Sequence, residues 1–282
     1  IIALGVDGIF IKDPSGLLKP ERATSLVKCM KSVMGSMPLQ LHSHCLSGLA
    51  PYTALRAVAA GVEVVHSATA PLANGASHPS TQGLVNNLER MGYNTEIDLT
   101  NISEVEEIIK FIAAKEDKPL GQILAYDEFH FHHQVAGGMI SNLKYQLSTV
   151  GLADRLEDIL QEAGRVREDL GYPIVVSPFA QYIITQSVLN VVAMDNGKER
   201  FSNVPDEIRL YVRGGYGEIA GNIDDNLYDR IAKGAEPIKQ RPGELVPPAL
   251  KKARKKLGTK VSDDDVLLSI FYDKKEFEGL KQ

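Results

Sequence analysis

The chain repeats one unit three times: a short apolar strand, a polar strand end and a helix. The predicted strands cover residues 8–12, 39–43 and 62–66, and the helices that follow them cover residues 20–34, 50–60 and 80–91. Nearly continuous apolar strands that alternate with helices are typical of a parallel sheet with right-handed crossovers. The sequence therefore predicts an α/β fold. Three units are too few to close a barrel, which needs about eight, so either upstream units are missing or the sheet is small and open.

The polar ends of the first two strands suggest a metal site. His42 and His44 are two residues apart, so on a strand both imidazoles point to the same side, with Cα atoms about 6.5 Å apart. Both rings could then reach one metal ion through bonds of about 2.1 Å. Lys12 ends the preceding strand and belongs to the same rim. An isolated His-x-His pair is more often structural, and a lysine at a strand end is usually solvated. However, polar residues recur at the carboxyl ends of successive strands. Parallel sheets carry their catalytic residues at these ends, so the repetition favours a functional site.

Other polar residues have a structural and a functional interpretation. His130, His132 and His133 form a possible second metal cluster, although polar loop residues at a domain junction fit the pattern better. Ser177 precedes a proline and is predicted to be a helix N-cap, with catalysis as the alternative. Cys45 is predicted to be an inert, packed thiol.

Composition excludes several classes of protein. A net charge of -5 over 282 residues, without a basic stripe, argues against nucleic-acid binding, and two cysteines form no disulfide framework. No apolar run reaches the roughly 18 residues of a membrane span. After Tyr93 the sequence is mainly helical, and Ser103 with Glu106 predicts a capping box. The predicted helices of this part cover residues 139–149, 152–169, 179–195, 205–213, 224–233, 247–256 and 262–271.

Several motifs, in order along nearly the whole chain, resemble biotin-dependent carboxyltransferases: pyruvate carboxylase, the oxaloacetate decarboxylase α subunit and the central subunit of transcarboxylase. Residues 11–20 (IKDPSGLLKP) are similar to the family's IKDMAGLLKP. Residues 41–48 (LHSHCLSG) resemble its LHxHxx(S/T)G, and residues 134–143 (QVAGGMISNL) resemble QIPGGMx(S/T)NL. Further segments resemble the decarboxylase and transcarboxylase branch: residues 165–171, 185–186 and 240–245.

The resemblance implies a fold and a domain division. Residues 1–92 would be the C-terminal part of a (β/α)₈ TIM barrel, about its last three strands, and residues 93–282 a mainly helical, funnel-like domain. The chain begins without an initiator methionine. We expect that an N-terminal part, which in the family carries an aspartate metal ligand, is missing.

The resemblance also implies roles for particular residues. A divalent metal (Zn, Mn or Co) would be held by His42, His44 and a carbamylated Lys12. Ser177 stands where the family has a threonine that passes a proton between substrate and biotin. Ala180 and Gln181 would lie near the biotin. The family has proline at the position of Ala136 and usually aspartate at the position of His66.

The implied reaction moves a carboxyl group between carboxybiotin and pyruvate or oxaloacetate. Biotin would be carried on a separate or missing domain. The implied partners are a biotinyl carrier domain and a biotin carboxylase subunit, and we expect a homodimer or larger oligomer. We expect a cytoplasmic location, or association with a membrane through a decarboxylase pump partner. Two alternatives stay open: a metal-dependent lyase or aldolase of the same barrel superfamily, and an inactive subunit that acts only in assembly.

Overall fold

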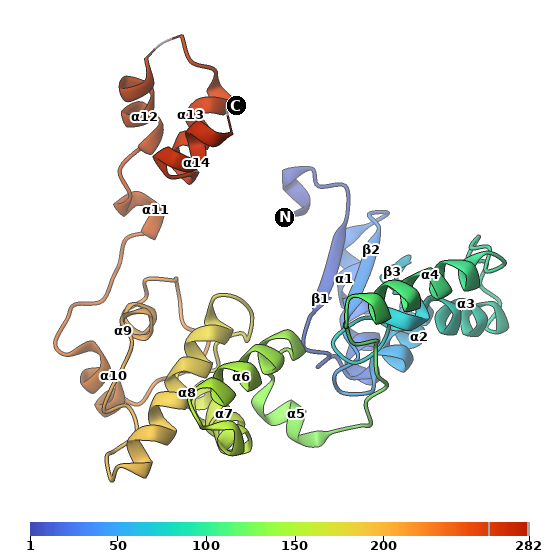
Figure 1. The fold of residues 1–282 in the computed structure, drawn as a ribbon, viewed down its shortest axis with the longest axis horizontal. Helices are drawn as coiled ribbons and strands as arrows, with labels where there is room; N and C mark the ends of the chain where they lie inside the picture. Colours follow the sequence, from blue (N-terminus) through green and yellow to red (C-terminus); the bar gives the residue numbers. More distant parts are fainter. Residues whose placement is uncertain (259, 281–282) are drawn as a thin grey trace. The chain divides into compact units, whose positions relative to one another are not determined.

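The computed structural model, which describes residues 1–258 and 260–280, contains the predicted parallel sheet (Figure 1). Strand β1 (Ile9–Asp13) pairs with β2 (Leu39–Ser43), and β2 pairs with β3 (Val64–Val65). Helices α1 (Pro20–Met34) and α2 (Ala50–Ala60) connect the three strands. The predicted strands and crossover helices are confirmed, although β3 is shorter than the five residues predicted.

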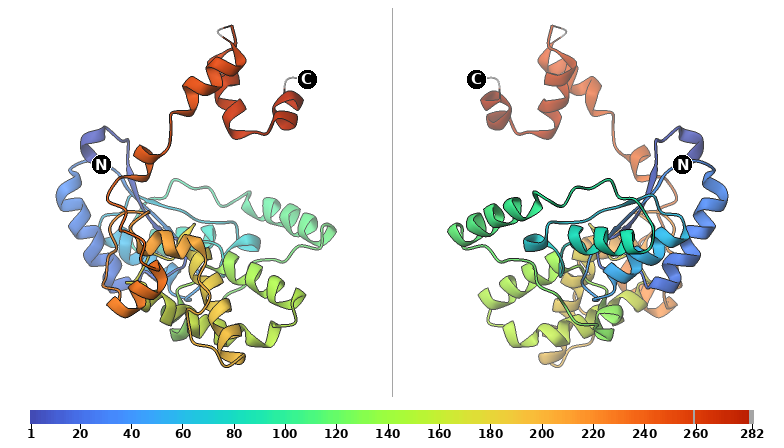
Figure 2. Two further views of the ribbon diagram at one scale, coloured as in Figure 1. Left: turned by 90° about the vertical axis from the view of Figure 1, so that its left-hand side faces the viewer. Right: turned by 90° about the vertical axis from the view of Figure 1, so that its right-hand side faces the viewer.

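The two faces of this sheet differ in what covers them. Leu39 and Leu41 of β2 are buried against the small residues of α1 and α2, which lie side by side (Figure 2). Burial of such apolar side chains stabilises the fold by roughly 1.5–3 kcal/mol each. Strand side chains alternate between faces, so the opposite face carries Phe10, Lys12 and His42, which are at least partly accessible. The accessible face therefore carries the polar strand ends.

The chain packs as two compact units. The first contains residues 1–205 and 220–227, and the second contains residues 206–219 and 228–282. The predicted boundary between residues 92 and 93 stays a prediction; it falls after α3, inside the first unit. The remaining helices of the first unit are α3 (Thr81–Arg90), α4 (Ile102–Lys115), α5 (Glu128–His133), α6 (Gly137–Thr149), α7 (Leu156–Asp169) and α8 (Phe179–Asp195).

Three local predictions in the first unit are wrong. Ser177 does not cap α8: the N-cap residue is Pro178, and no side chain caps the helix. Ser103 forms no capping box, since α4 starts after Asn101, and Glu106 instead accepts hydrogen bonds from the backbone of Ala70 and from Gln82. The histidine-rich segment expected to be a loop is helix α5.

A buried polar network joins α7 and α8. The Glu162 side chain is 2% exposed, and its Oε1 accepts hydrogen bonds from Arg200 Nε and Asn190 Nδ2, each at 2.7 Å. Arg200 also donates to Asp169 through Nη2 at 2.6 Å. Burial lowers the pKa of Arg200, but its hydrogen bonds to Glu162 and its pairing with Asp169 outweigh burial, so the pKa lies above its ordinary value. The positive charge of Arg200 thus compensates the negative charges of Glu162 and Asp169 between the two helices.

The second unit is built from short helices. They are α9 (Asp206–Val212), most of α10 (Asp225–Ala232), α11 (Pro242–Leu245), α12 (Ala249–Leu257), α13 (Asp263–Phe271) and α14 (Lys274–Gly279). Arg209 donates to the Ile231 carbonyl at 2.6 Å, and Arg254 of α12 forms an ion pair with Asp263 of α13. Within the described residues, every helix is too short or too polar to cross a bilayer.

Candidate metal centre

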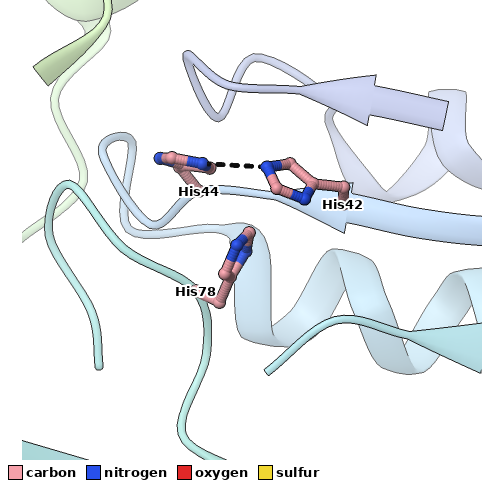
Figure 3. A group of neighbouring side chains, drawn as sticks. All are labelled: His42, His44 and His78. Atoms are coloured by element: carbon pink, nitrogen blue, oxygen red, sulfur yellow. Dashed lines mark hydrogen bonds between the residues drawn. The ribbon is translucent and has the colours of Figure 1, made fainter. Parts of the chain in front are cut away.

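His42 and His44 lie together at the carboxyl end of β2, as their spacing predicts. His42 is in the strand, and His44 follows it directly. The two Nε2 atoms are 3.1 Å apart (Figure 3). Ligand atoms at about 2.1 Å from a tetrahedral metal are roughly 3.4 Å apart, so this separation is close to that of two ligands of a shared ion.

A third imidazole, that of His78, faces the same point (Figure 3). His78 comes from the loop between β3 and α3, and its ring centre lies 4.2 Å from that of His42 and 4.7 Å from that of His44. One ring nitrogen from each of the three histidines lies within 4.8 Å of the others. Sequence reasoning missed His78, because a single histidine in a loop has no spacing motif. Its only signal is its place after a strand that ends at the same rim.

These histidines also make hydrogen bonds with groups outside the cluster. His78 Nδ1 donates to the Ser43 carbonyl at 3.1 Å, and His44 hydrogen-bonds the backbone of Ala76. His42 Nδ1 is 2.9 Å from Nδ1 of His66, whose Nε2 is 3.2 Å from the side-chain oxygen of Gln40.

Their surroundings keep His42 and His44 neutral. Burial, together with the nearby rings of His78 and His44, lowers the pKa of His42 to about 4. Burial and His78 also lower the pKa of His44. Neutral imidazole is the form that binds metals. His42 and His44 therefore fit a divalent cation in both donor type and protonation state, and His78 fits it in donor type.

Lys12 lies beside the cluster. It is the register partner of His42 across β1 and β2, and its charge contributes to the lowered pKa of His42. Its side chain is exposed. The structure thus places all three predicted metal ligands at one rim, and their role as ligands stays a prediction.

The loop beneath the cluster is held by Asp13 and Gly16. The buried Asp13 carboxylate accepts hydrogen bonds from the Leu17 and Leu18 amides and from Ser43 Oγ, at 2.7 to 3.0 Å. Gly16 has a φ of +64°, and a Cβ there would lie 2.4 Å from the carbonyl oxygen of His44. A side chain at this position would displace the backbone that carries His44.

The other predicted site residues lie at the start of α8. Ser177 and Gln181 are exposed, and Ala180 is buried. Among the described residues, no hydrogen bond joins Ser177 or Gln181 to the histidine cluster. Their proposed roles toward substrate and biotin stay predictions.

The histidines of α5 form no second metal cluster in the described part of the chain. His130 is buried, with Nε2 2.5 Å from the Ser15 carbonyl, and His132 Nε2 is 3.3 Å from the Gln161 carbonyl. His133 Nδ1 accepts the amide hydrogen of Val135 at 3.0 Å. Cys45 is buried, and burial raises its pKa to about 12, which fits the predicted inert thiol.

His133 makes stability depend on pH. Burial, with the charge of His130, lowers its pKa to about 4, whereas an unfolded histidine titrates near 6.5. The unfolded chain therefore binds the proton more readily, and stability falls as pH drops from 6.5 through 4, by up to about 3 kcal/mol from this group. We expect His133→Asn, whose amide oxygen can still accept from Val135, to weaken this dependence. Unfolding free energies of both proteins at pH 7 and pH 4.5 measure it; equal pH slopes would contradict the assignment.

Comparisons with known proteins agree with this geometry. The model of a "Conserved carboxylase domain" matches residues 131–282, more than half of the chain, and an "HMGL-like" model matches residues 1–109. The chain belongs to the conserved carboxylase domain family. This confirms the resemblance found in the sequence motifs.

Relatives in the conserved carboxylase domain family match almost all of this chain. A pyruvate carboxylase subunit of Methanocaldococcus jannaschii is 39% identical over 276 residues, covering 95% of this chain and 47% of that protein. The methylmalonyl-CoA carboxyltransferase 5S subunit of Propionibacterium freudenreichii subsp. shermanii is 31% identical, covering 95% of this chain and 53% of that protein. The chain thus spans about half the length of the curated relatives it matches.

A solved structure confirms the fold class. The carboxyl transferase domain of Rhizobium etli pyruvate carboxylase matches with a TM-score of 0.82 at 26% identity, covering 98% of this chain and 48% of that one. The same domain solved with pyruvate and biocytin matches with the same TM-score and identity. The α/β part is therefore the C-terminal part of a TIM barrel, followed by a mainly helical part.

Proposed function

We propose that this chain belongs to an enzyme that transfers a carboxyl group between carboxybiotin and pyruvate or oxaloacetate. The observation that carries the proposal is the His42–His44 pair, with its two Nε2 atoms 3.1 Å apart at the strand ends of a fold shared with carboxyl transferase domains. The relatives named for pyruvate carboxylase and for methylmalonyl-CoA carboxyltransferase support the reaction class.

The balance of the reaction shows what the residues must do. A C–N bond of carboxybiotin breaks, a C–C bond forms at the methyl carbon of pyruvate, and a methyl proton moves to the biotin nitrogen. A divalent metal held by His42 and His44 would stabilise the negative charge that develops on the carbonyl oxygen. Ser177 would pass the proton through its hydroxyl. Lys12 would add an anionic oxygen ligand as a carbamate.

The proposal includes cofactors and partners. Biotin would arrive on a carrier domain, with Ala180 and Gln181 beside its ring, and a biotin carboxylase subunit would recharge it. The metal would be Zn, Mn or Co, and the protein would work in the cytoplasm as a dimer or larger oligomer.

Isotope exchange in the native protein tests the function. We expect labelled pyruvate to enter oxaloacetate at a rate that rises with added biotin and falls when a chelator removes the metal. Metal-dependent cleavage without a biotin effect would instead support the lyase or aldolase alternative. A protein without metal or exchange would support a role in assembly only.

Ser177 offers a residue-specific prediction. We expect Ser177→Ala to lower the biotin-dependent exchange rate about a hundredfold, at the lower end of what proton transfer contributes. Ser177→Thr keeps the hydroxyl and should retain most of the activity. Both variants should keep their metal content and fold, because Ser177 is exposed and caps no helix. An active alanine variant would remove Ser177 from the mechanism.

A further inference from the structure

The segment that joins β1 to α1, residues 14–19, supports the backbone of the histidine cluster. It begins two residues after Lys12, and its Gly16 lies so close to His44 that a Cβ there would be 2.4 Å from the His44 carbonyl oxygen. The amide of His44 also donates to the Asp13 carbonyl at 3.0 Å. A shift of residues 14–19 would therefore move the backbone that carries His44.

Helix α5 contacts this segment through three side chains. His130 Nε2 is 2.5 Å from the Ser15 carbonyl oxygen, and both residues are only 3% exposed. A carbonyl can only accept, so His130 Nε2 carries the hydrogen and donates it. Lys19 Nζ lies 4.3 Å from the ring centre of Phe131 and 3.8 Å from a carboxylate oxygen of Glu128. The side chains of Lys19 and Glu128 are 43% and 70% exposed, so this ion pair contributes little, and the buried His130 contact is the stronger one.

Two other donors hold the same segment from the side of the sheet. Ser47, in the loop after β2, donates to the Gly16 carbonyl at 2.5 Å, and Thr53 of α2 donates to the Leu18 carbonyl at 2.8 Å. The hydrogen bond from His130 differs because it spans 115 positions of the chain and comes from the helical part. It therefore joins the helical part to the segment beneath the cluster.

We propose that His130 is a positioning residue for the metal centre: it holds residues 14–19 against α5 and so keeps His44 in place to bind a divalent cation. His130 acts through this segment and not on the cation. This inference rests on the metal site of the proposed function and deepens it, and it leaves the predicted ligands Lys12, His42 and His44 unchanged. It also gives the histidine-rich helix a role other than a second metal cluster.

Cobalt binding to the native protein tests the inference. The protein is stripped of metal and titrated with Co²⁺, whose visible absorption reports the ligand geometry as well as the affinity. His130→Asn carries an amide that is too short to reach the Ser15 carbonyl, and we expect it to weaken binding about tenfold and to change the spectrum. His130→Gln restores the reach and should recover most of the affinity and the original spectrum. His130→Leu, which removes the polar atoms, should resemble His130→Asn.

His132→Asn is the matched control. His132 belongs to the same helix, and its Nε2 lies 3.3 Å from a backbone carbonyl, but that carbonyl belongs to Gln161 of α7. The same change at this exposed histidine should leave the affinity and the spectrum unchanged. An effect as large as that of His130→Asn would show that any damage to α5 is sufficient, which would overturn the specific role of His130.

Amide hydrogen exchange of the metal-free proteins measures the contact without the cation. The amides of Leu17 and Leu18 donate to Asp13, and we expect His130→Asn to speed their exchange about tenfold while the amides of α2 keep their rate. Unchanged exchange and Co²⁺ affinity, or a His130→Gln protein as impaired as His130→Asn, would overturn the role of His130 and leave the carboxyltransferase proposal standing. An unchanged protein that binds no Co²⁺ would overturn both.

Discussion

Replacing His42 with alanine is expected to abolish stoichiometric metal binding and to lower carboxyl exchange at least a thousandfold. His42 contributes the nitrogen closest to His44 and is the ring that His66 orients. Its ring centre is also closer to that of His78 than the ring centre of His44 is. A bound metal stabilises developing charge by several kcal/mol, and every 1.36 kcal/mol is a factor of ten in rate.

Metal content and exchange rate of the purified variant measure this effect. The control is His132→Ala, which removes an imidazole of α5 and should leave both quantities unchanged. The thermal midpoint should be compared after the metal has been removed from both proteins, so that lost folding is not mistaken for lost binding. A His42→Ala protein with a full complement of metal would disprove the centre.

Replacing Arg200 with alanine is expected to destabilise the first unit by about 3–5 kcal/mol, the usual result of removing one partner of a buried ion pair. Glu162 is 2% exposed and would keep its charge among apolar residues of α7 and α8. Among the described residues, Asn190 would remain as its only close donor, because Arg165 lies 3.9 Å away from the other carboxylate oxygen. Asp169 would lose the hydrogen bond it accepts from Arg200.

Arg155→Ala is the matched control. Arg155 is as exposed as Arg200 and also pairs with two acids, but both acids are solvent-exposed. Such pairs contribute about 1 kcal/mol or less. Denaturant unfolding should therefore separate the two variants clearly. Adding Glu162→Gln to Arg200→Ala should restore part of the loss, because a neutral amide costs less to bury; equal stability of the Arg200 and Arg155 variants would refute the role of the network.

Local periodicity was enough to predict the sheet and two of the three histidines of the cluster. Strand and helix periods set the order of β1, α1, β2 and α2, and the spacing of His42 and His44 placed them on one side. His78 could not be predicted in this way, since its position depends on how the loop before α3 folds back onto Ser43. Contacts between segments far apart in sequence leave no local pattern.

The wrong predictions of the capping box and of the histidine-rich loop have two different origins. Ser103 and Glu106 have the spacing of a capping box, but Glu106 finds tertiary partners in Ala70 and Gln82. The histidine-rich segment looked like a loop, yet Asp127 accepts the amide of Phe129 and caps a helix there. The partners of Glu106 are far away in the sequence, whereas Asp127 caps α5 through a residue only two positions away.

The hydrogen bonds of Asp13 determine where negative charge lies near the histidine cluster. This carboxylate follows Lys12 directly, but its oxygens are committed to Leu17, Leu18 and Ser43. Those hydrogen bonds fix its negative charge beside the cluster, where it opposes the lowering of the pKa of His44. A cation held by His42 and His44 would therefore be partly balanced by a carboxylate that is not itself a ligand.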